Sequence, residues 1–163
     1  GSLEYLKNIR SKVKIPLLRK DFIINEYQIY QSKLYGADCI LLIVSALSDS
    51  QLKEFKTIAE SLDLDVLVEI HNQDELERIQ PIDFPFIGIN NRNLSTFEVD
   101  LKTTKELSLN LKDKLVVSES GIKTREDIDQ ILNYDVLNFL VGESFMRAVN
   151  PGTELRKLFF SPE

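Results

Sequence analysis

Residues 115–128 read LVVSESGIKTREDI, and this stretch decides the fold because it predicts a buried strand, a polar strand end and a helix start in succession. Residues 115–117 form a continuous apolar run, which is typical of a parallel strand covered on both faces. Thr124 with Asp127 three residues later predicts a helix N-terminus with an acidic first turn. The stretch therefore predicts a strand followed by a helix, the repeating unit of α/β proteins.

A glutamate, a serine and a glycine end the predicted strand, at residues 119–121. Ligands of α/β proteins bind at this end of a strand, and a glycine there lets backbone N–H groups approach an anion. The alternative is an ordinary turn in which Ser120 and Gly121 serve only the geometry of the chain. Taken alone, the stretch leaves both interpretations open.

The pattern of a strand followed by a helix recurs six times along the chain. Parallel strands joined by right-handed helical crossovers form either an open doubly wound sheet or a barrel. A barrel is favoured because no GxGxxG follows the first strand, the units have similar lengths, and almost every strand ends in polar or glycine residues that could converge on one mouth. The expected strands are residues 16–22, 39–44, 65–71, 84–93, 115–120 and 136–142.

The length of the chain limits the barrel. A TIM (β/α)₈ barrel typically needs about 250 residues, whereas this chain has 163. We therefore expect either an open sheet or a single, partial TIM-barrel domain over residues 1–163 that lacks two of the βα units.

Composition and charge restrict the class of protein. The chain is 43% hydrophobic and 28% charged, which is the balance of a globular domain. No apolar run has the roughly 20 residues of a membrane span and no signal peptide is recognisable, so we expect a cytoplasmic protein without a membrane partner. The net charge of −6 argues against a nucleic-acid surface. An anionic ligand must therefore be held by local groups.

Two residue types that often bind metals occur once each. Cys39 is the single cysteine and lies in the apolar run DCILLIV, which predicts a buried core thiol rather than a disulfide or a cysteine metal cluster. His71 is the single histidine and cannot build a histidine metal site by itself. We therefore expect no metal centre.

Chemically useful side chains gather at the predicted strand ends. A lysine with two glutamates suits proton transfer, because burial and mutual attraction can hold the lysine as a general acid and a glutamate as a base. An asparagine and an arginine can orient hydroxyl groups or oxyanions. Each residue alone would be interpreted as a rim salt bridge or a turn residue, but their recurrence over consecutive strands indicates a shared site. The residues are Lys20, Glu69, Asn90, Arg92, Glu119, Ser120, Gly121 and Gly142.

The strings around these residues resemble those of the indole-3-glycerol phosphate synthase family. They are PLLRKDF, LVEIHNQDELERI, FIGINNRNLSTFEVDL, VVSESGIKTREDI and FLVGESFMRAVNPG, and they run from the first residues almost to the C-terminus. The resemblance implies a TIM barrel that closes the indole ring on 1-(2-carboxyphenylamino)-1-deoxyribulose 5-phosphate in tryptophan biosynthesis. This carbon–carbon lyase reaction releases CO₂ and water and uses no cofactor.

The resemblance also implies a role for each catalytic candidate. Lys20 of RKDF resembles the general acid that protonates the substrate carbonyl oxygen during ring closure, and Glu69 of LVEIH resembles the proton-transfer residue of the later dehydration. We expect these two residues at the ends of neighbouring strands. Asn90 and Arg92 resemble residues that orient the substrate and a catalytic side chain, and Glu119 lines the pocket.

The substrate phosphate is assigned by the same resemblance. Ser120, Gly121 and Gly142, with the backbone of Glu143, resemble the phosphate cradle that follows the last two strands of the barrel. This agrees with the usual phosphate site of such barrels, at the loops after the seventh and eighth strands. The N–H groups of helix starts suit an anion even in an acidic protein.

The family's first strand, with a catalytic Glu and Lys, and its second strand have no counterpart in the sequence. The chain begins with GSLEYL, which resembles the family's segment just after the second strand. One interpretation is a piece of the synthase that is weakly active or inactive alone. Another is a non-catalytic fragment that forms a homo-oligomer or binds a complementing N-terminal piece. A third, a related phosphate-binding barrel such as phosphoribosylanthranilate isomerase, is disfavoured by RKDF and GINNRN.

The two strands that would flank the missing pair predict self-association. If barrel geometry is kept, the strands at residues 16–22 and 136–142 flank the absent strands and present unpaired apolar edges. Such edges invite pairing with another chain. We expect a self-associated species with little synthase activity of its own.

Overall fold

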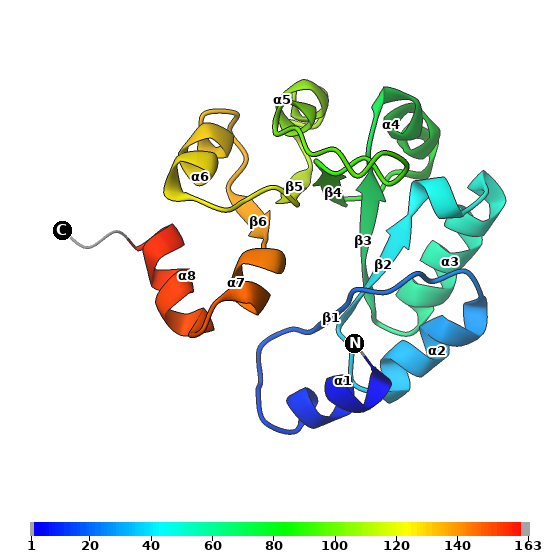
Figure 1. The fold of residues 1–163 in the computed structure, drawn as a ribbon. Helices are drawn as coiled ribbons and strands as arrows, with labels where there is room; N and C mark the ends of the chain where they lie inside the picture. The colour runs from blue at the N-terminus through cyan, green and yellow to red at the C-terminus, as the bar shows by residue number, and fades with distance from the viewer. Residues whose placement is uncertain (1, 161–163) are drawn as a thin grey trace. The chain divides into compact units, whose positions relative to one another are not determined.

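The computed structural model describes residues 2–160. It confirms the expected α/β class, with six parallel strands that are each followed along the chain by a helix (Figure 1). Packing divides the described residues into two compact units, residues 2–70 with 77–86 and residues 71–76 with 87–160. Among the helices of residues 2–160, none combines the length and the apolar character that a membrane span requires.

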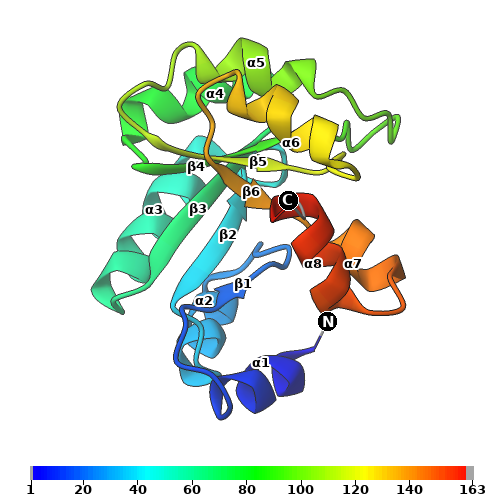
Figure 2. The ribbon, with the colours of Figure 1, turned by 90° about the vertical axis from the view of Figure 1, so that its left-hand side faces the viewer.

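The first unit holds three strands in the order β1-β2-β3, with parallel pairing between neighbours. Helix α3 packs on β3, and α2 packs on α3 (Figure 2). This unit contains the helices α1 (Leu3–Arg10), α2 (Glu26–Leu34) and α3 (Asp49–Ser61), the strands β1 (Leu18–Arg19), β2 (Cys39–Ile43) and β3 (Asp65–Ile70), and the 3-10 turns η1 (Val44–Ala46) and η2 (Gln80–Ile82).

The second unit holds the strands β4, β5 and β6 in that order, and β5 pairs with β6 in parallel so that Glu119 lies opposite Leu140. Helix α8 packs against both α6 and α7. The strands are β4 (Phe86–Asn90), β5 (Leu115–Glu119) and β6 (Asn138–Leu140), and the helices are α5 (Lys102–Ser108), α6 (Arg125–Leu132), α7 (Glu143–Arg147) and α8 (Pro151–Phe159); α4 (Gln73–Ile79) contributes residues to both units.

The helix starts lie where local sequence signals predict them. Asn25, Ser48 and Thr124 are N-caps that form capping boxes with Gln28, Gln51 and Asp127. Each box satisfies backbone N–H groups that have no partner within the helix. The predicted start of α6 at Thr124 is therefore confirmed.

The first, fourth and last strands are shorter than predicted. We expected strands over residues 16–22, 84–93 and 136–142, but β1 covers only Leu18–Arg19, β4 only Phe86–Asn90 and β6 only Asn138–Leu140. Just after β1 the backbone turns to local partners, because the N–H of Phe22 donates to Asp21 Oδ1 and the carbonyl oxygen of Phe22 accepts from Gln28 Nε2. These contacts compete with continued strand pairing.

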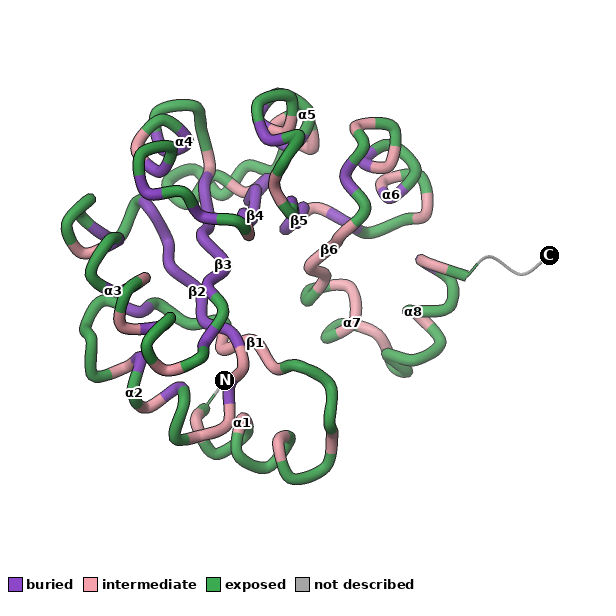
Figure 3. The backbone as a smooth tube through the Cα atoms, turned by 180° about the vertical axis from the view of Figure 1, so that it is seen from behind, coloured by how far each residue is buried: buried purple, intermediate pink, exposed green. Residues whose placement is uncertain are grey.

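The core follows the strands in each unit, except at β1 and β6. Every residue of β2 is buried, as are the residues of β3 after Asp65 and of β5 after Leu115, whereas β1 and β6 are half-buried throughout (Figure 3). A continuous buried run is expected of a parallel strand covered on both faces. The half-buried β6 therefore leaves apolar surface partly uncovered.

Cys39 is a buried free thiol at the start of β2, as the sequence predicts. Burial raises the pKa of its thiol from 9.0 to about 11. Because the thiolate is the reactive form, iodoacetamide at pH 8 should modify the folded chain about a hundredfold more slowly than the urea-unfolded chain. Mass spectrometry of the alkylated protein measures this ratio, and equal rates in the two states would contradict the burial.

Candidate active site

Lys20 and Glu69, the first predicted pair, meet in the first unit. Lys20 directly follows β1, and Glu69 is the last residue but one of β3. Lys20 Nζ lies 2.9 Å from Glu69 Oε2, and the side chains are 40% and 2% exposed. A buried carboxylate is tolerated when a charged partner compensates it. The lysine side chain is thus partly exposed, whereas its carboxylate partner is enclosed by protein.

We expected this pair at the ends of neighbouring strands, and that expectation is wrong. Strand β2 lies between β1 and β3. Parallel strands are about 4.8 Å apart, so a pair that crosses one intervening strand spans about 10 Å between backbones. Only long side chains close that distance. Lysine and glutamate together do so, which places the ion pair over the end of β2.

Arg92 and Glu143, two predicted substrate-binding residues, form an ion pair in the second unit. Arg92 Nη2 lies 3.0 Å from Glu143 Oε2, and Glu143 Oε1 accepts a hydrogen bond from Arg147 Nε at 3.0 Å. The hydrogen bond and charge of Arg147, with the charges of Arg92 and Lys123, lower the pKa of the Glu143 carboxyl group. An anion bound beside Arg92 would therefore compete with an ionised carboxylate.

Asn90 orients the start of the segment that carries Arg92. Asn90 is the last residue of β4 and is buried, and its Oδ1 accepts a hydrogen bond from the backbone N–H of Arg92 at 3.0 Å. The chain then returns toward the strand end, since the N–H of Asp100 donates to the carbonyl oxygen of Asn91 and Arg92 forms an antiparallel bridge with Val99. The loop after β4 is thus closed on itself.

The turn after β5 has a left-handed backbone conformation at the serine and the glycine of the SESG motif. Ser120 and Gly121 both adopt left-handed conformations, with φ of +64° and +83°. An added Cβ at Gly121 would lie 2.5 Å from Val99 Cγ1, closer than real Cβ contacts allow. Gly121 is therefore required both by the conformation and by the close approach. The preceding Glu119 ends β5 and is buried.

The turn after β5 is joined to the start of α7. Ser144 Oγ donates a hydrogen bond to the carbonyl oxygen of Ile122 at 2.7 Å. Gly142, the N-cap of α7, has open space where a Cβ would lie, with no atom within 4 Å. The residues predicted to cradle phosphate therefore lie on two segments that one hydrogen bond connects.

Asn91 is a buried residue of the site that the sequence-based assignment left out, although it lies inside GINNRN. Its side-chain Nδ2 donates to Ser118 Oγ and to the carbonyl oxygens of Glu119 and Ser120, at 3.0, 3.0 and 3.2 Å. Its Oδ1 accepts from the backbone N–H and the hydroxyl of Thr104, at 3.1 and 2.8 Å. A second asparagine after a strand that already ends in asparagine was the available signal.

The site residues thus fall into two groups by geometry. Lys20 and Glu69 meet in the first unit, whereas the residues from Asn90 to Arg92, from Ser118 to Gly121 and from Gly142 to Ser144 are linked in the second. Within residues 2–160, no three His, Cys, Asp or Glu side chains lie close enough together to hold a metal ion. The Lys20–Glu69 pair suits proton transfer, and the second group offers an arginine and a left-handed turn to an anion.

A comparison with protein-family models identifies the family of this chain. The family model for indole-3-glycerol phosphate synthase matches residues 1–158. The chain belongs to this family. The resemblance carried by RKDF, GINNRN, SESGI and VGESFM is therefore confirmed over nearly the whole chain.

Curated members of the family are close in sequence but longer. The indole-3-glycerol phosphate synthase of Delftia acidovorans is 51% identical over 160 residues, which are 98% of this chain and 60% of that protein. The corresponding protein of Polaromonas naphthalenivorans is 52% identical, and the match covers 61% of its length. This chain of the synthase family thus spans about three fifths of these relatives.

Two solved structures of similar fold are distant from this chain in sequence. A crystal structure of KGPDC from Streptococcus mutans, solved as a complex with a ligand, aligns with a TM-score of 0.74 at 18% identity, covering 95% of this chain and 76% of that one. A second structure of KGPDC from the same organism aligns with a TM-score of 0.72. The likeness supports the expected incomplete TIM-barrel fold for this synthase-family chain.

Proposed function

We propose that the protein contributes the larger part of an indole-3-glycerol phosphate synthase. The reaction closes the indole ring of 1-(2-carboxyphenylamino)-1-deoxyribulose 5-phosphate with loss of one CO₂ and one water. The observation that carries this proposal is the ion pair between Lys20 Nζ and the buried Glu69 carboxylate at 2.9 Å, formed by the two residues of the family motifs assigned to proton transfer.

The pair supplies an acid and a base within hydrogen-bond reach of each other. Lys20 protonates the substrate carbonyl oxygen as the ring closes, and Glu69 takes up and returns protons in the dehydration that follows. Positioned proton transfer contributes about 10²- to 10⁴-fold to a rate. The 40% exposure of Lys20 leaves room for a substrate oxygen beside its ammonium group.

The remaining residues bind and orient the substrate in this proposal. Arg92 binds an anionic group of the substrate after its ion pair with the Glu143 carboxylate has opened. Asn90 fixes the Arg92 backbone through its 3.0 Å hydrogen bond. The phosphate lies against the backbone of Ser120, Gly121, Gly142 and Glu143, and Glu119 lines the pocket. The left-handed turn at residues 120 and 121 supports this cradle, because such turns form anion-binding concavities.

The experiment compares this chain alone with the chain joined to the remaining part of the Delftia acidovorans relative. Formation of indole-3-glycerol phosphate is followed by its fluorescence. We expect turnover from the joined protein and little or none from the chain alone. A joined protein that is folded by circular dichroism but inactive would overturn the proposal.

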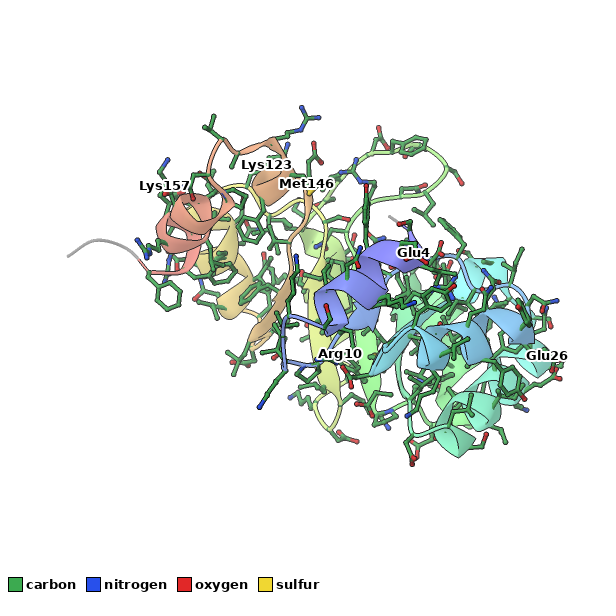
Figure 4. The ribbon with its side chains drawn as sticks, turned by 90° about the horizontal axis from the view of Figure 1, so that it is seen from below. Glu4, Arg10, Glu26, Lys123, Met146 and Lys157 are labelled. Atoms are coloured by element: carbon green, nitrogen blue, oxygen red, sulfur yellow. The ribbon has the colours of Figure 1, made fainter. Side chains whose placement is uncertain are left out.

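A second function, self-association as a non-catalytic module, is favoured by one observation. The half-buried β6 lies in a unit with many exposed large apolar side chains, and Met146 on α7 is 87% exposed (Figure 4). Surface of this kind is uncommon on a monomer. The exposed apolar residues of the second unit include Leu109, Leu115, Leu137, Met146, Val149, Leu155 and Phe160.

Self-association should therefore be measurable on the chain alone. Sedimentation velocity at micromolar concentration should show a dimer or larger species, because burying apolar surface yields about 25 cal/mol per Å². Changing Met146 and Val149 together to lysine should shift the population toward monomer. Changing the exposed polar residues Asn8 and Thr57 of the first unit to lysine, which adds the same charge of two, should leave the distribution unaltered. A monomer for the unchanged chain would contradict this prediction.

A further inference from the structure

Ser120 is held in a conformation that non-glycine residues seldom adopt. Its φ is +64°, directly before Gly121 at +83°. A left-handed conformation is unfavourable for a non-glycine residue, because its Cβ lies too close to the following carbonyl oxygen. Strain of this kind persists only where the surroundings determine the backbone, and it concentrates at functional sites. The contacts that hold this turn therefore matter to whatever binds there.

The side-chain amide of Asn91 holds the carbonyl oxygens on both sides of the strained residue. Nδ2 donates to the carbonyl oxygen of Glu119 at 3.0 Å and to that of Ser120 at 3.2 Å. The backbone N–H of Asn91 also donates to the carbonyl oxygen of Glu119, at 2.9 Å. The end of β4 thus fixes the end of β5 through three hydrogen bonds from one residue.

The orientation of this amide is set by a backbone N–H, which can only donate, and by carbonyl oxygens, which can only accept. Asn91 Oδ1 accepts from the backbone N–H of Thr104 at 3.1 Å, so the oxygen must face α5 and the NH₂ group must face the turn. Thr104 Oγ1 donates to Oδ1 at 2.8 Å and lies 2.8 Å from Ser118 Oγ, which accepts from Nδ2 at 3.0 Å. The three side chains close a ring of hydrogen bonds.

The ring is enclosed by protein. Asn91 is 2% exposed, and Thr104 and Ser118 are fully buried. Hydrogen bonds of buried groups are costly to leave unmade, and closed networks restrict side chains to one arrangement. On the other side of the turn, Val99 and Leu101 lie against Gly121. The turn is therefore fixed by a polar contact and by an apolar one.

We propose that Asn91 is a positioning residue that holds the Ser120–Gly121 turn in the left-handed form that receives the substrate phosphate. This inference rests on the proposed function. Asn91 acts through the two carbonyl oxygens and does not touch the phosphate. Thr104 and Ser118 orient Asn91, so their loss should affect the turn less than the loss of the amide.

The first test measures the turn in the chain itself, without a ligand. Native-state amide hydrogen exchange of residues 120–122 should become about tenfold faster in Asn91→Ala, because hydrogen bonds worth about 1 kcal/mol each are lost from the turn. Thr104→Val is the matched control, since it removes one hydroxyl of the same ring and leaves the amide bonds to the turn in place. Equal exchange at residues 120–122 in the two variants would overturn the inference.

A coupling measurement covers the case in which Asn91→Ala does not fold. Glycine adopts positive φ without strain, so Ser120→Gly should raise the unfolding free energy of the parent chain, where Asn91 holds the left-handed turn, more than that of the Asn91→Ala chain, where the turn can relax. A double-mutant cycle by urea unfolding measures this coupling, with Asn91→Ser in place of Asn91→Ala if needed. A coupling of zero would overturn the inference.

The second test separates this inference from the proposed function. Titration with inorganic phosphate, followed by the amide shifts of Ser120, Gly121 and Glu143, should give about tenfold weaker binding for Asn91→Ala than for the parent chain and for Thr104→Val. Equal binding by all three proteins would overturn the role of Asn91 and leave the phosphate site intact. A parent chain that does not bind phosphate would overturn the phosphate site and this inference with it.

Discussion

Replacing Lys20 with alanine lowers the turnover of the proposed synthase reaction by about 10²- to 10⁴-fold, the usual effect of losing a positioned general acid. The measurement uses the chain joined to the remaining part of its Delftia acidovorans relative and follows product fluorescence. The physical reason is the geometry of the pair, with Lys20 Nζ 2.9 Å from a buried carboxylate and partly open to a ligand. Substrate binding should change much less than turnover.

A second variant separates proton transfer from electrostatics. Arginine keeps the positive charge beside Glu69 but does not give up its proton in proteins. Lys20→Arg should therefore retain the stability that the ion pair provides while turnover stays low. Full activity of Lys20→Arg would show that the charge alone is needed and that Lys20 is not the acid.

The control for Lys20 is another lysine of the same unit. Lys33 lies on α2, and its Nζ donates to the carbonyl oxygen of Asp63 at 3.2 Å, away from the pair with Glu69. Lys33→Ala should leave turnover within about twofold, because an exposed side chain that makes a single hydrogen bond contributes little. Near-normal turnover of Lys20→Ala itself would remove Lys20 from the mechanism.

Replacing Gly121 with valine should abolish phosphate binding and lower the unfolding free energy by several kcal/mol. Two effects add. A β-branched residue is strongly disfavoured at φ of +83°, and its Cβ would lie 2.5 Å from Val99 Cγ1 and 3.1 Å from Leu101 Cδ2. Urea unfolding gives the stability, and titration with inorganic phosphate gives the binding.

Two further variants identify which effect dominates. Val99→Ala removes the atom that a new Cβ would meet, so Gly121→Ala should cost less in that background than in the parent. Gly152→Ala is the matched control, because its Cβ would make only an ordinary 3.4 Å contact with Asn150 Oδ1 near the start of α8. A Gly121→Val chain as stable as Gly152→Ala would contradict the described turn.

A feature of the fold could be predicted when the residues that form it lie close together in sequence. The cap at Thr124 was predicted because the capping residue and its partner, Asp127, lie three residues apart in sequence. The lengths of β1 and β6 were not, because the end of a strand depends on a partner strand far away in the sequence.

The sequence by itself determined the family, the six βα units and the identity of the residues at the strand ends. Those features are written in contiguous strings such as RKDF and GINNRN, so they can be recognised without coordinates. The same strings also named Arg92, Glu119 and Gly121 as site residues, whose roles stay predictions.

Only the tertiary structure decided which of these residues meet. The partners in the Lys20–Glu69 and Arg92–Glu143 ion pairs are 49 and 51 residues apart in sequence, and the Asn91 amide reaches Ser120 across 29. No local pattern encodes such distances, since they follow from strand order and from the packing of loops on strand ends. The left-handed backbone of Ser120 also could not be predicted locally, because a non-glycine residue keeps that conformation only where the surrounding structure determines it.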